Sequence, residues 1–183
     1  CLKANVKLVH ISTDHLFDGI SAFVQEGTQL SPLNNYAKTK AQGEKTVLIK
    51  NPKALVIRTN FFGLGPSYKA SFSDKILKNL ESNKPSKLFD DVYYSPISVK
   101  TLSEKINLLL DKSAEGIFNI CSNERITKYQ FGKMMASAFG YSWDLIIPIS
   151  IKDIPNLTIR PKDMSLSNHK LCTYLGSYVP SLE

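Results

Sequence analysis

The sequence predicts an α/β fold in which short parallel strands alternate with helices. Two apolar runs, at residues 6–11 and 54–58, are short and lack helical periodicity, so each fits a buried strand. The stretch between them is long enough for one helix, which is the crossover that two parallel strands require. A third apolar run, at residues 116–121, extends the predicted sheet.

Four helices are predicted from apolar spacing and from capping patterns: residues 32–50, 73–83, 99–112 and 127–139. The first opens with Ser31 as N-cap and Pro32 at the first helical position, and Asn51-Pro52 ends it. The last opens with the capping box Thr127-x-x-Gln130.

The other segments are predicted to be loops and short strands. Residues 59–63 form a loop after the second strand, and residues 87–99 form a short strand and a loop. The tail, residues 144–183, holds one strand candidate at 145–149, a loop with Arg160-Pro161 and a final short helix.

Length and composition indicate one globular domain, or a large piece of one. The chain has 183 residues, of which 43% are hydrophobic and 21% charged. It has no run of 18 apolar residues, so we expect no membrane partner. The net charge is +7, but only three of the 23 basic residues are Arg, the residue favoured for base and phosphate recognition. We therefore expect no nucleic-acid partner.

The cysteine and histidine residues predict neither disulfides nor a metal site. Three Cys and three His are few, and their spacing fits no known ligand pattern. Reduced thiols in a cytoplasmic protein are the expectation. The chain begins at Cys1 without an initiator Met or a leader pattern, so we expect a stretch of a longer protein.

Tyr36 and Lys40 are the first candidates for catalysis. They stand four residues apart on a predicted helix and therefore project from the same face. A phenol is a poor acid at neutral pH, and a nearby ammonium makes its proton easier to transfer. Thr13 follows a predicted strand at the edge where open α/β sheets bind ligands, so its hydroxyl could bind the carbonyl oxygen that Tyr36 protonates.

The spacing of this pair is weak evidence by itself. With 8 Tyr and about 20 Lys in the chain, about one Tyr-x-x-x-Lys is expected by chance. A second pair, Tyr129 and Lys133, lies in the opening turns of a late helix without a strand and hydroxyl motif upstream. One alternative is that Tyr36 and Lys40 are ordinary surface residues. The other is that Thr13 and Asp14 only form a turn at the end of the strand.

Segments in a fixed order resemble the extended short-chain dehydrogenase/reductase superfamily and, within it, the dTDP-4-dehydrorhamnose reductases. That family's pattern is Ser-Thr-Asp, two residues, Phe-Asp-Gly, then Pro-x-x-x-Tyr-Gly-x-x-Lys with Gly-Glu shortly after. The matching segments are ISTDHLFDG (11–19), EGTQLSPLNNYAKTKAQGEK (26–45) and IRTNFFG (57–63), followed by DDVYYSPIS (90–98) and RPKDMSLSNHKL (160–171).

This resemblance implies the carboxyl-terminal part of a doubly wound, Rossmann-like parallel sheet with a small α+β substrate-binding lobe. Residues 1–63 and 97–121 would form the sheet and carry the catalytic residues, and residues 64–96 and 122–183 would form the lobe. The family's glycine-rich turn, which binds the cofactor pyrophosphate, does not occur in the chain. We therefore expect a fragment that is inactive alone, with an open strand edge covered by another copy, a missing segment or a rearrangement.

The resemblance also implies a reaction: reduction by NADPH or NADH of the C4 keto group of a nucleotide-linked 4-keto-6-deoxy sugar, as in dTDP-rhamnose biosynthesis. The implied catalytic residues are Thr13, Tyr36 and Lys40. The cofactor would bind to Ser12, Tyr36 and Lys40. The nucleotide sugar would bind to Thr13, Asp14, Phe61 and Arg160, where Phe61 replaces the family's usual Trp.

Two other functions stay open. A nucleotide-sugar epimerase of the same superfamily fits most of these residues, although the Phe-Asp-Gly segment at residues 17–19 favours a reductase. The chain also resembles the regulatory β subunit of methionine adenosyltransferase, so a non-catalytic binding module is the second alternative.

Overall fold

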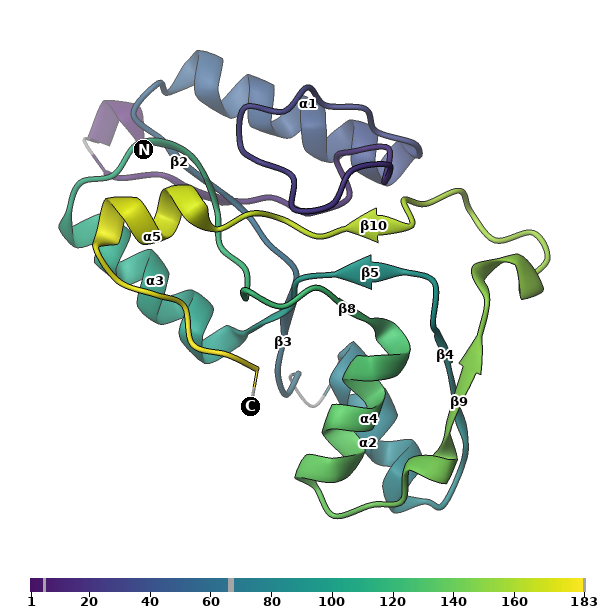
Figure 1. Ribbon diagram of the computed structural model, residues 1–183. Coiled ribbons are helices and arrows are strands. Elements are labelled where there is room, and N and C mark those ends of the chain that lie inside the picture. The colour runs from purple at the N-terminus through teal and green to yellow at the C-terminus, as the bar shows by residue number, and fades with distance from the viewer. Residues whose placement is uncertain (5, 66–67, 183) are drawn as a thin grey trace.

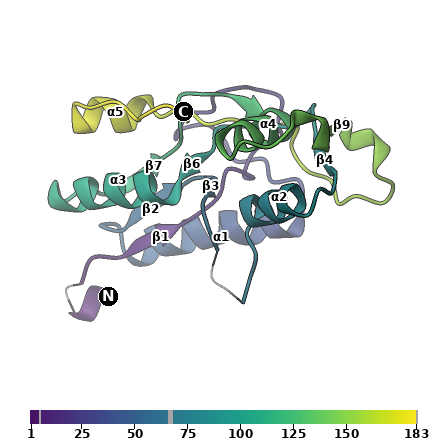
Figure 2. The ribbon, with the colours of Figure 1, turned by 90° about the horizontal axis from the view of Figure 1, so that it is seen from below.

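The computed structural model describes residues 1–4, 6–65 and 68–182 and confirms an α/β fold with parallel sheets. The central sheet has three parallel strands in the order β1-β2-β7; β2 is labelled in Figure 1, and all three are labelled in Figure 2. These strands are β1 (Val9–Ile11), β2 (Leu55–Arg58) and β7 (Gly116–Asn119). The central strand β2 is fully buried, which explains its continuous apolar sequence.

Helices cover both faces of the central sheet. Figure 2 shows α1 (Asn35–Lys50) on one side of it, and α3 (Val99–Asp111) and α5 (His169–Leu175) on the other. The core on the α3 side joins buried residues from the strands and both helices: Leu55, Ile57, Leu102, Leu109, Phe118 and Leu171. Each such side chain contributes about 1.5–3 kcal/mol on burial, so this core fixes the sheet that carries the candidate site.

A second, smaller part of the molecule has its own core. Helices α2 (Phe72–Glu81) and α4 (Lys128–Ala138) pack against the parallel pair β4 (Ser86–Phe89) and β9 (Ile146–Ile149). The buried residues of this core come from all of these elements and from two neighbouring strands: Ile76, Leu80, Leu88, Tyr94, Phe131, Ala136, Ile146 and Met164.

Short strands and turns connect the two parts. β3 (Phe61–Phe62) pairs with β6 (Ile97–Ser98), and β5 (Tyr93–Tyr94) lies between β10 (Asp163–Met164) and β8 (Ile126–Thr127). Three 3-10 turns complete the described elements: Leu2–Ala4, Trp143–Leu145 and Ile151–Asp153. The sheet around β5 places the segment before α5 beside the end of the small part (Figure 1).

Most predicted elements are confirmed, including the helices near residues 73–83, 99–112 and 127–139 and the strand near 145–149. The capping box of α4 forms as predicted: Gln130 N donates to Thr127 Oγ1 at 3.0 Å, and Thr127 N donates to Gln130 Oε1 at 2.8 Å. The helix α5 also stands where a final short helix was expected.

The predicted start of α1 is wrong. The helix begins at Asn35, because Asn34 is the N-cap and its side chain accepts a hydrogen bond of 2.9 Å from Ala37 N. Ser31 does not cap this helix; its N–H donates to Leu16 O at 2.9 Å. The prediction of a plain loop at residues 59–63 is also wrong, since Phe61 and Phe62 form β3.

The division into two lobes stays a prediction, and we propose one change to it. Residues 122–183 were assigned to the substrate-binding lobe, yet Leu171 and Val179 pack in the core of the central sheet. The tail from about residue 169 onward, which begins with α5, therefore belongs with the sheet in the division that we propose.

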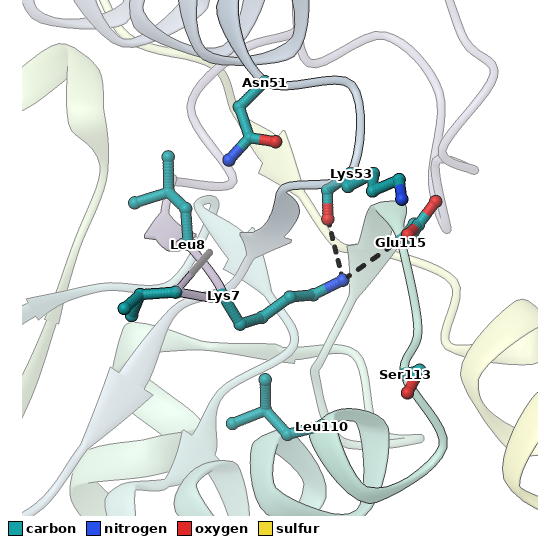
Figure 3. Close-up of a pocket in the computed structure, with 8 residues that line it drawn as sticks. Lys7, Leu8, Asn51, Lys53, Leu110, Ser113 and Glu115 are labelled. Carbon is teal, nitrogen blue, oxygen red and sulfur yellow. Dashed lines mark hydrogen bonds and ion pairs between the residues drawn. The ribbon is translucent and has the colours of Figure 1, made fainter. Parts of the chain in front are cut away.

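A cavity of about 500 Å³ opens at the amino ends of the central strands. Figure 3 shows Lys7 spanning it: Lys7 Nζ donates to Lys53 O at 2.7 Å and lies 3.9 Å from Glu115 Oε1. Open α/β sheets bind ligands at the carboxyl ends of their strands, so this cavity is at the opposite edge from the predicted site. Across the described ranges, no helix is long and apolar enough to cross a membrane.

Candidate functional site

The carboxyl end of β1 carries three buried polar residues, Ser12, Thr13 and Asp14. Ser12 N continues the sheet pairing by donating to Ile57 O at 2.7 Å. The Thr13 hydroxyl accepts a hydrogen bond from His15 N and donates one to Asp14 Oδ1, both at 3.3 Å. The loop is therefore fixed by its own hydrogen bonds, with the Thr13 side chain at its centre.

Asp14 ties this loop to the next strand. It is 1% exposed, and its Oδ2 accepts a 2.7 Å hydrogen bond from Asn60 Nδ2. Asn60 directly follows the buried Thr59 after β2, so the ends of β1 and β2 are joined through two side chains. A buried carboxylate needs such donors, because an unpaired buried charge is costly.

Tyr36 and Lys40 reach the same strand end from the first turns of α1. The Tyr36 ring is 55% exposed and packs edge to face against His15, with ring centroids 5.7 Å apart. Lys40 Nζ donates to Ile11 O, the last carbonyl of β1, at 2.7 Å. Lys40 thus contacts the end of β1, and Tyr36 contacts the loop that contains Thr13.

A buried ion pair that the sequence analysis did not single out holds α1 in this position. Arg58 Nη2 and Nε donate to the two oxygens of Glu44 at 2.8 and 3.0 Å, and both side chains are almost fully buried. Arg58 Nη1 also donates to Glu26 O at 3.0 Å. The bidentate geometry fixes the rotation of α1 about its axis and hence the direction in which Tyr36 and Lys40 point.

A cavity of about 230 Å³ adjoins the site on the side of the small part. Its lining residues are His15, Phe72, Lys87, Leu88, Phe89, Val92, Lys128, Arg160 and Met164. Arg160 therefore lines the same cavity as His15, the residue that contacts Tyr36. Burial is the largest cause that lowers the pKa of His15; Lys128 and Arg160 lower it further and Asp14 opposes them.

Lys128 is a second feature that sequence reasoning missed. Its Nζ lies 3.2 Å from the ring centroid of Tyr94 and 5.1 Å from that of Phe72. Burial lowers the pKa of Lys128 to about 8; Asp14 opposes this shift and Arg160 adds to it. Its position directly after the N-cap Thr127 was visible in the sequence, but nothing local indicated that the side chain faces a cavity.

Phe61 does not line the cavity that holds Arg160. It is 52% exposed and lines a different hollow of about 250 Å³ with Leu64 and Val99. Phe61 still follows Asn60 directly, so the two hollows flank the carboxyl ends of the strands. No group of three or more His, Cys, Asp or Glu side chains in the described part of the chain is placed to hold a metal ion.

The chain is similar in sequence to a probable reductase and to a subunit of methionine adenosyltransferase 2. It is 28% identical over 187 residues to the "Probable low-salt glycan biosynthesis reductase Agl14" of Haloferax volcanii, covering all of this chain and 62% of that protein. It is 33% identical over 174 residues to "Methionine adenosyltransferase 2 subunit beta" of Xenopus laevis, covering 90% of this chain and 51% of that protein. The chain thus spans between about half and two thirds of these relatives.

Solved structures agree with this placement. A hypothetical dTDP-4-dehydrorhamnose reductase from Sulfolobus tokodaii superposes with a TM-score of 0.84 at 28% identity, covering all of this chain and 63% of that one. A dTDP-4-dehydrorhamnose reductase from Bacillus anthracis, solved in complex with NADP, shares the fold with a TM-score of 0.88 at 24% identity, covering 98% and 63%. The predicted fold class is confirmed: the chain matches the carboxyl-terminal part of such reductases.

The family model described as "RmlD substrate binding domain" matches residues 1–182, nearly the whole chain. The match includes the loop of Thr13 and Asp14 and the helix of Tyr36 and Lys40. The chain belongs to the RmlD substrate-binding domain family.

Proposed function

We propose that this chain carries the catalytic and substrate-binding residues of an NAD(P)H-dependent reductase. Its substrate would be the C4 keto group of a nucleotide-linked 4-keto-6-deoxy sugar. The observation that supports this most is that all three side chains are tied to one segment: Lys40 Nζ donates to the last carbonyl of β1, Thr13 lies in the loop that follows β1, and the Tyr36 ring packs on His15 of that loop. We propose the activity for the whole protein to which the chain belongs, since the chain spans 62% of the reductase Agl14.

In this proposal Tyr36 donates a proton to the keto oxygen while C4 gains a hydride, so the carbonyl becomes a hydroxyl. The exposed ring of Tyr36 is accessible to a substrate from the solvent side. Lys40 uses one of its three donors on Ile11 O and keeps the others for a ligand. Lys40 stands one helical turn from Tyr36, so both side chains can face one ligand.

Thr13 has the role of a second hydrogen-bond donor to the keto oxygen. Its hydroxyl proton is directed to Asp14 at 3.3 Å, a long contact that a carbonyl oxygen can replace by rotation of the hydroxyl. Asp14 itself is buried and already bonded to Asn60. We infer that Asp14 positions Thr13 and the β2 end, in place of the direct contact with the sugar that the resemblance implied.

The residues at the end of β1 also fit a nicotinamide cofactor, which supplies the hydride when bound. Ser12 Oγ is buried and has no hydrogen-bond partner among the described residues, so a polar ligand atom would satisfy it. Lys40 has donors left for ribose hydroxyls. We therefore propose Ser12, Tyr36 and Lys40 as the residues that would hold the cofactor.

Arg160 is proposed to bind the nucleotide part of the substrate, because it lines the cavity next to His15. Phe61 is proposed as an apolar wall for the sugar or the cofactor on the other side of Asn60. With a Phe at this position the wall has no indole N–H to donate, so sugar recognition relies on other donors.

The test is to assay the full-length protein with a 4-keto-6-deoxy nucleotide sugar and either NADPH or NADH. We expect Tyr36→Phe to lower kcat by at least ~10²-fold, the usual size of a general-acid contribution. Tyr129→Phe is the matched control, because Tyr129 belongs to the second Tyr-x-x-x-Lys and lies on α4 near Trp143, away from β1. Equal turnover by wild type and Tyr36→Phe would refute the proton-donor role.

A non-catalytic role is the second candidate, favoured by the 33% identity to a subunit of methionine adenosyltransferase 2. A binding module of this kind would show no reduction with any sugar and would form a complex with a partner enzyme. An epimerase would convert the nucleotide sugar without net consumption of reduced nicotinamide. Following nicotinamide absorbance together with product identity in one assay separates the three functions.

A further inference from the structure

The cavity beside His15 is lined by basic groups from three separate segments. Lys87 comes from β4, Lys128 from the first turn of α4 and Arg160 from the loop before β10. None of the described residues that line it is acidic. Neighbouring cations repel one another, so this convergence favours an anionic ligand.

Lys128 is the most unusual of these cations. Its ammonium rests on the face of Tyr94, and no carboxylate or carbonyl oxygen of the described residues lies within hydrogen-bond distance of Nζ. Lys87 is exposed at the rim, whereas Lys128 is partly buried. An ammonium that rests on aromatic faces keeps its three N–H donors free for a ligand, and the cation–π contacts hold it in place at the cavity.

Other charged groups near the cavity are already paired. Asp14 is the carboxylate that acts electrostatically on Lys128, but its oxygens are bonded to Asn60 and Thr13. Arg160 makes one weak hydrogen bond, from Nε to Thr158 O at 3.4 Å, and no ion pair among the described residues. Lys128 and Arg160 are therefore both available to an anion in the cavity.

We propose that this cavity binds a phosphate-type anion and that Lys128, together with Arg160, is the residue that binds it. The identity of the ligand rests on the proposed function, in which the anion is the diphosphate of the nucleotide sugar. Arg160 supplies planar paired donors, and Lys128 supplies a compact charge from the opposite wall. Phe72, Phe89 and Val92 complete the cavity with apolar surface for the less polar part of the ligand.

Binding of the anion is coupled to the proton of Lys128. The groups that face this side chain are Asp14, His15, Tyr94, Lys87 and Arg160, and only Asp14 favours its charged form. Above pH 8 the free protein holds Lys128 increasingly in the neutral form, and a bound diphosphate restores the ammonium. The ligand should therefore bind with uptake of a proton, and its affinity should fall as pH rises above 8.

Calorimetric titration tests this with three probes: dTDP, inorganic diphosphate and thymidine. We expect Lys128→Met to weaken dTDP and diphosphate by at least ~10-fold at pH 7, as for the loss of a charged hydrogen bond, and to leave thymidine unchanged. Lys133→Met is the matched control, because Lys133 also lies on α4 over an aromatic ring, 4.3 Å from the Trp143 centroid, but does not line the cavity. At pH 8.5, two buffers of different ionisation enthalpy should report proton uptake with dTDP by wild type and by Lys133→Met, and not by Lys128→Met.

Unchanged binding of dTDP and diphosphate in Lys128→Met, or an equal loss in Lys133→Met, would overturn the proposal. Lys128→Arg retains the charge and should retain binding, and urea unfolding of each variant identifies any that fail to fold. If dTDP binding depends on Lys128 but no keto sugar is reduced, the proposed function fails and the anion site stands. If reduction and its KM are normal in Lys128→Met, the anion site fails and the proposed function stands.

Discussion

Asn60 Nδ2 donates a 2.7 Å hydrogen bond to Asp14 Oδ2, and this contact joins the carboxyl ends of two neighbouring parallel strands. The two residues are 46 positions apart in the sequence, yet each lies in the loop that follows its strand, Asp14 after β1 and Asn60 after β2. The pairing of β1 with β2 places them side by side, and the buried carboxylate makes their contact necessary.

Asn60→Ala should destabilise the protein by about 1–3 kcal/mol, because it leaves a buried carboxylate oxygen without its donor. Urea unfolding followed by circular dichroism measures the change. Asn107→Ala on the exposed face of α3 is the control and should stay within about 0.5 kcal/mol of wild type. Equal stability of the two variants would show that the Asp14 contact contributes nothing.

The buried pair of Glu44 and Arg58 makes a stronger prediction. Glu44→Gln removes one charge and leaves the Arg58 guanidinium buried without its partner, so we expect a loss of about 3–5 kcal/mol in unfolding free energy. The double variant Glu44→Leu/Arg58→Met removes both charges and should recover much of that loss. A double variant as unstable as the single one would mean that the pair acts through shape rather than charge.

The central sheet could be predicted from the sequence because its strands are short, continuous apolar runs. The run Leu55 to Arg58 is buried on both sides, and such a strand leaves a clear signal. The place of Ser12, Thr13 and Asp14 could also be predicted, because they come directly after the apolar run of β1 and the local sequence is enough to put them at its carboxyl end. Tyr36 and Lys40 were identifiable from their helical spacing together with this neighbouring strand.

Contacts between distant segments could not be predicted. The strands β3 and β6 have two residues each, too few for any periodicity, and they exist because Phe61 pairs with Ile97 across the fold. Lys128 reads as an ordinary first-turn residue, and its place over Tyr94 depends on how β5 and β8 pair. The start of α1 was misplaced because Ser31-Pro32 imitates a helix start, while the side chain of Asn34 makes the real cap.

The lowered pKa of Lys128 predicts a pH dependence of stability. Below pH 8 this group is charged in both the folded and unfolded states, so the folded protein bears the full cost of burying it. Between pH 8 and its ordinary value of 10.5 the unfolded state binds more protons, and the contribution of Lys128 to stability improves as pH rises. The unfolding free energy of wild type relative to Lys128→Met should therefore rise by about 3 kcal/mol at most between pH 7 and 10.5.

Urea unfolding at several pH values measures this difference. The comparison of wild type with Lys133→Met corrects for the other titrating groups and should be nearly independent of pH. A difference between wild type and Lys128→Met that falls as pH rises would show that the folded state stabilises the Lys128 ammonium.

The open edge of β1 predicts self-association of the 183-residue chain. β1 pairs only with β2 among the described strands. Leu8 O and Ser12 N both point to β2, so the backbone groups of Val9 and Ile11, on the alternate positions, face the other way. Ile11 O accepts a hydrogen bond from Lys40 Nζ, but in the described structure no strand pairs with the backbone N–H and C=O of Val9. An uncovered strand edge of this kind pairs readily with another chain.

Light scattering over a range of concentrations should show association of this chain, and a charge on the edge should oppose it. Ile11→Lys places that charge at the end of β1, where the side chain is 38% exposed, and should raise the dissociation constant by at least ~10-fold. Ile49→Lys adds the same charge at a 65% exposed position on α1 and should have little effect, because α1 contributes no backbone edge. A chain that stays monomeric at every concentration would show that the edge of β1 does not pair with another chain. An equal effect of Ile11→Lys and Ile49→Lys would mean that association depends on the total surface charge and not on the strand edge.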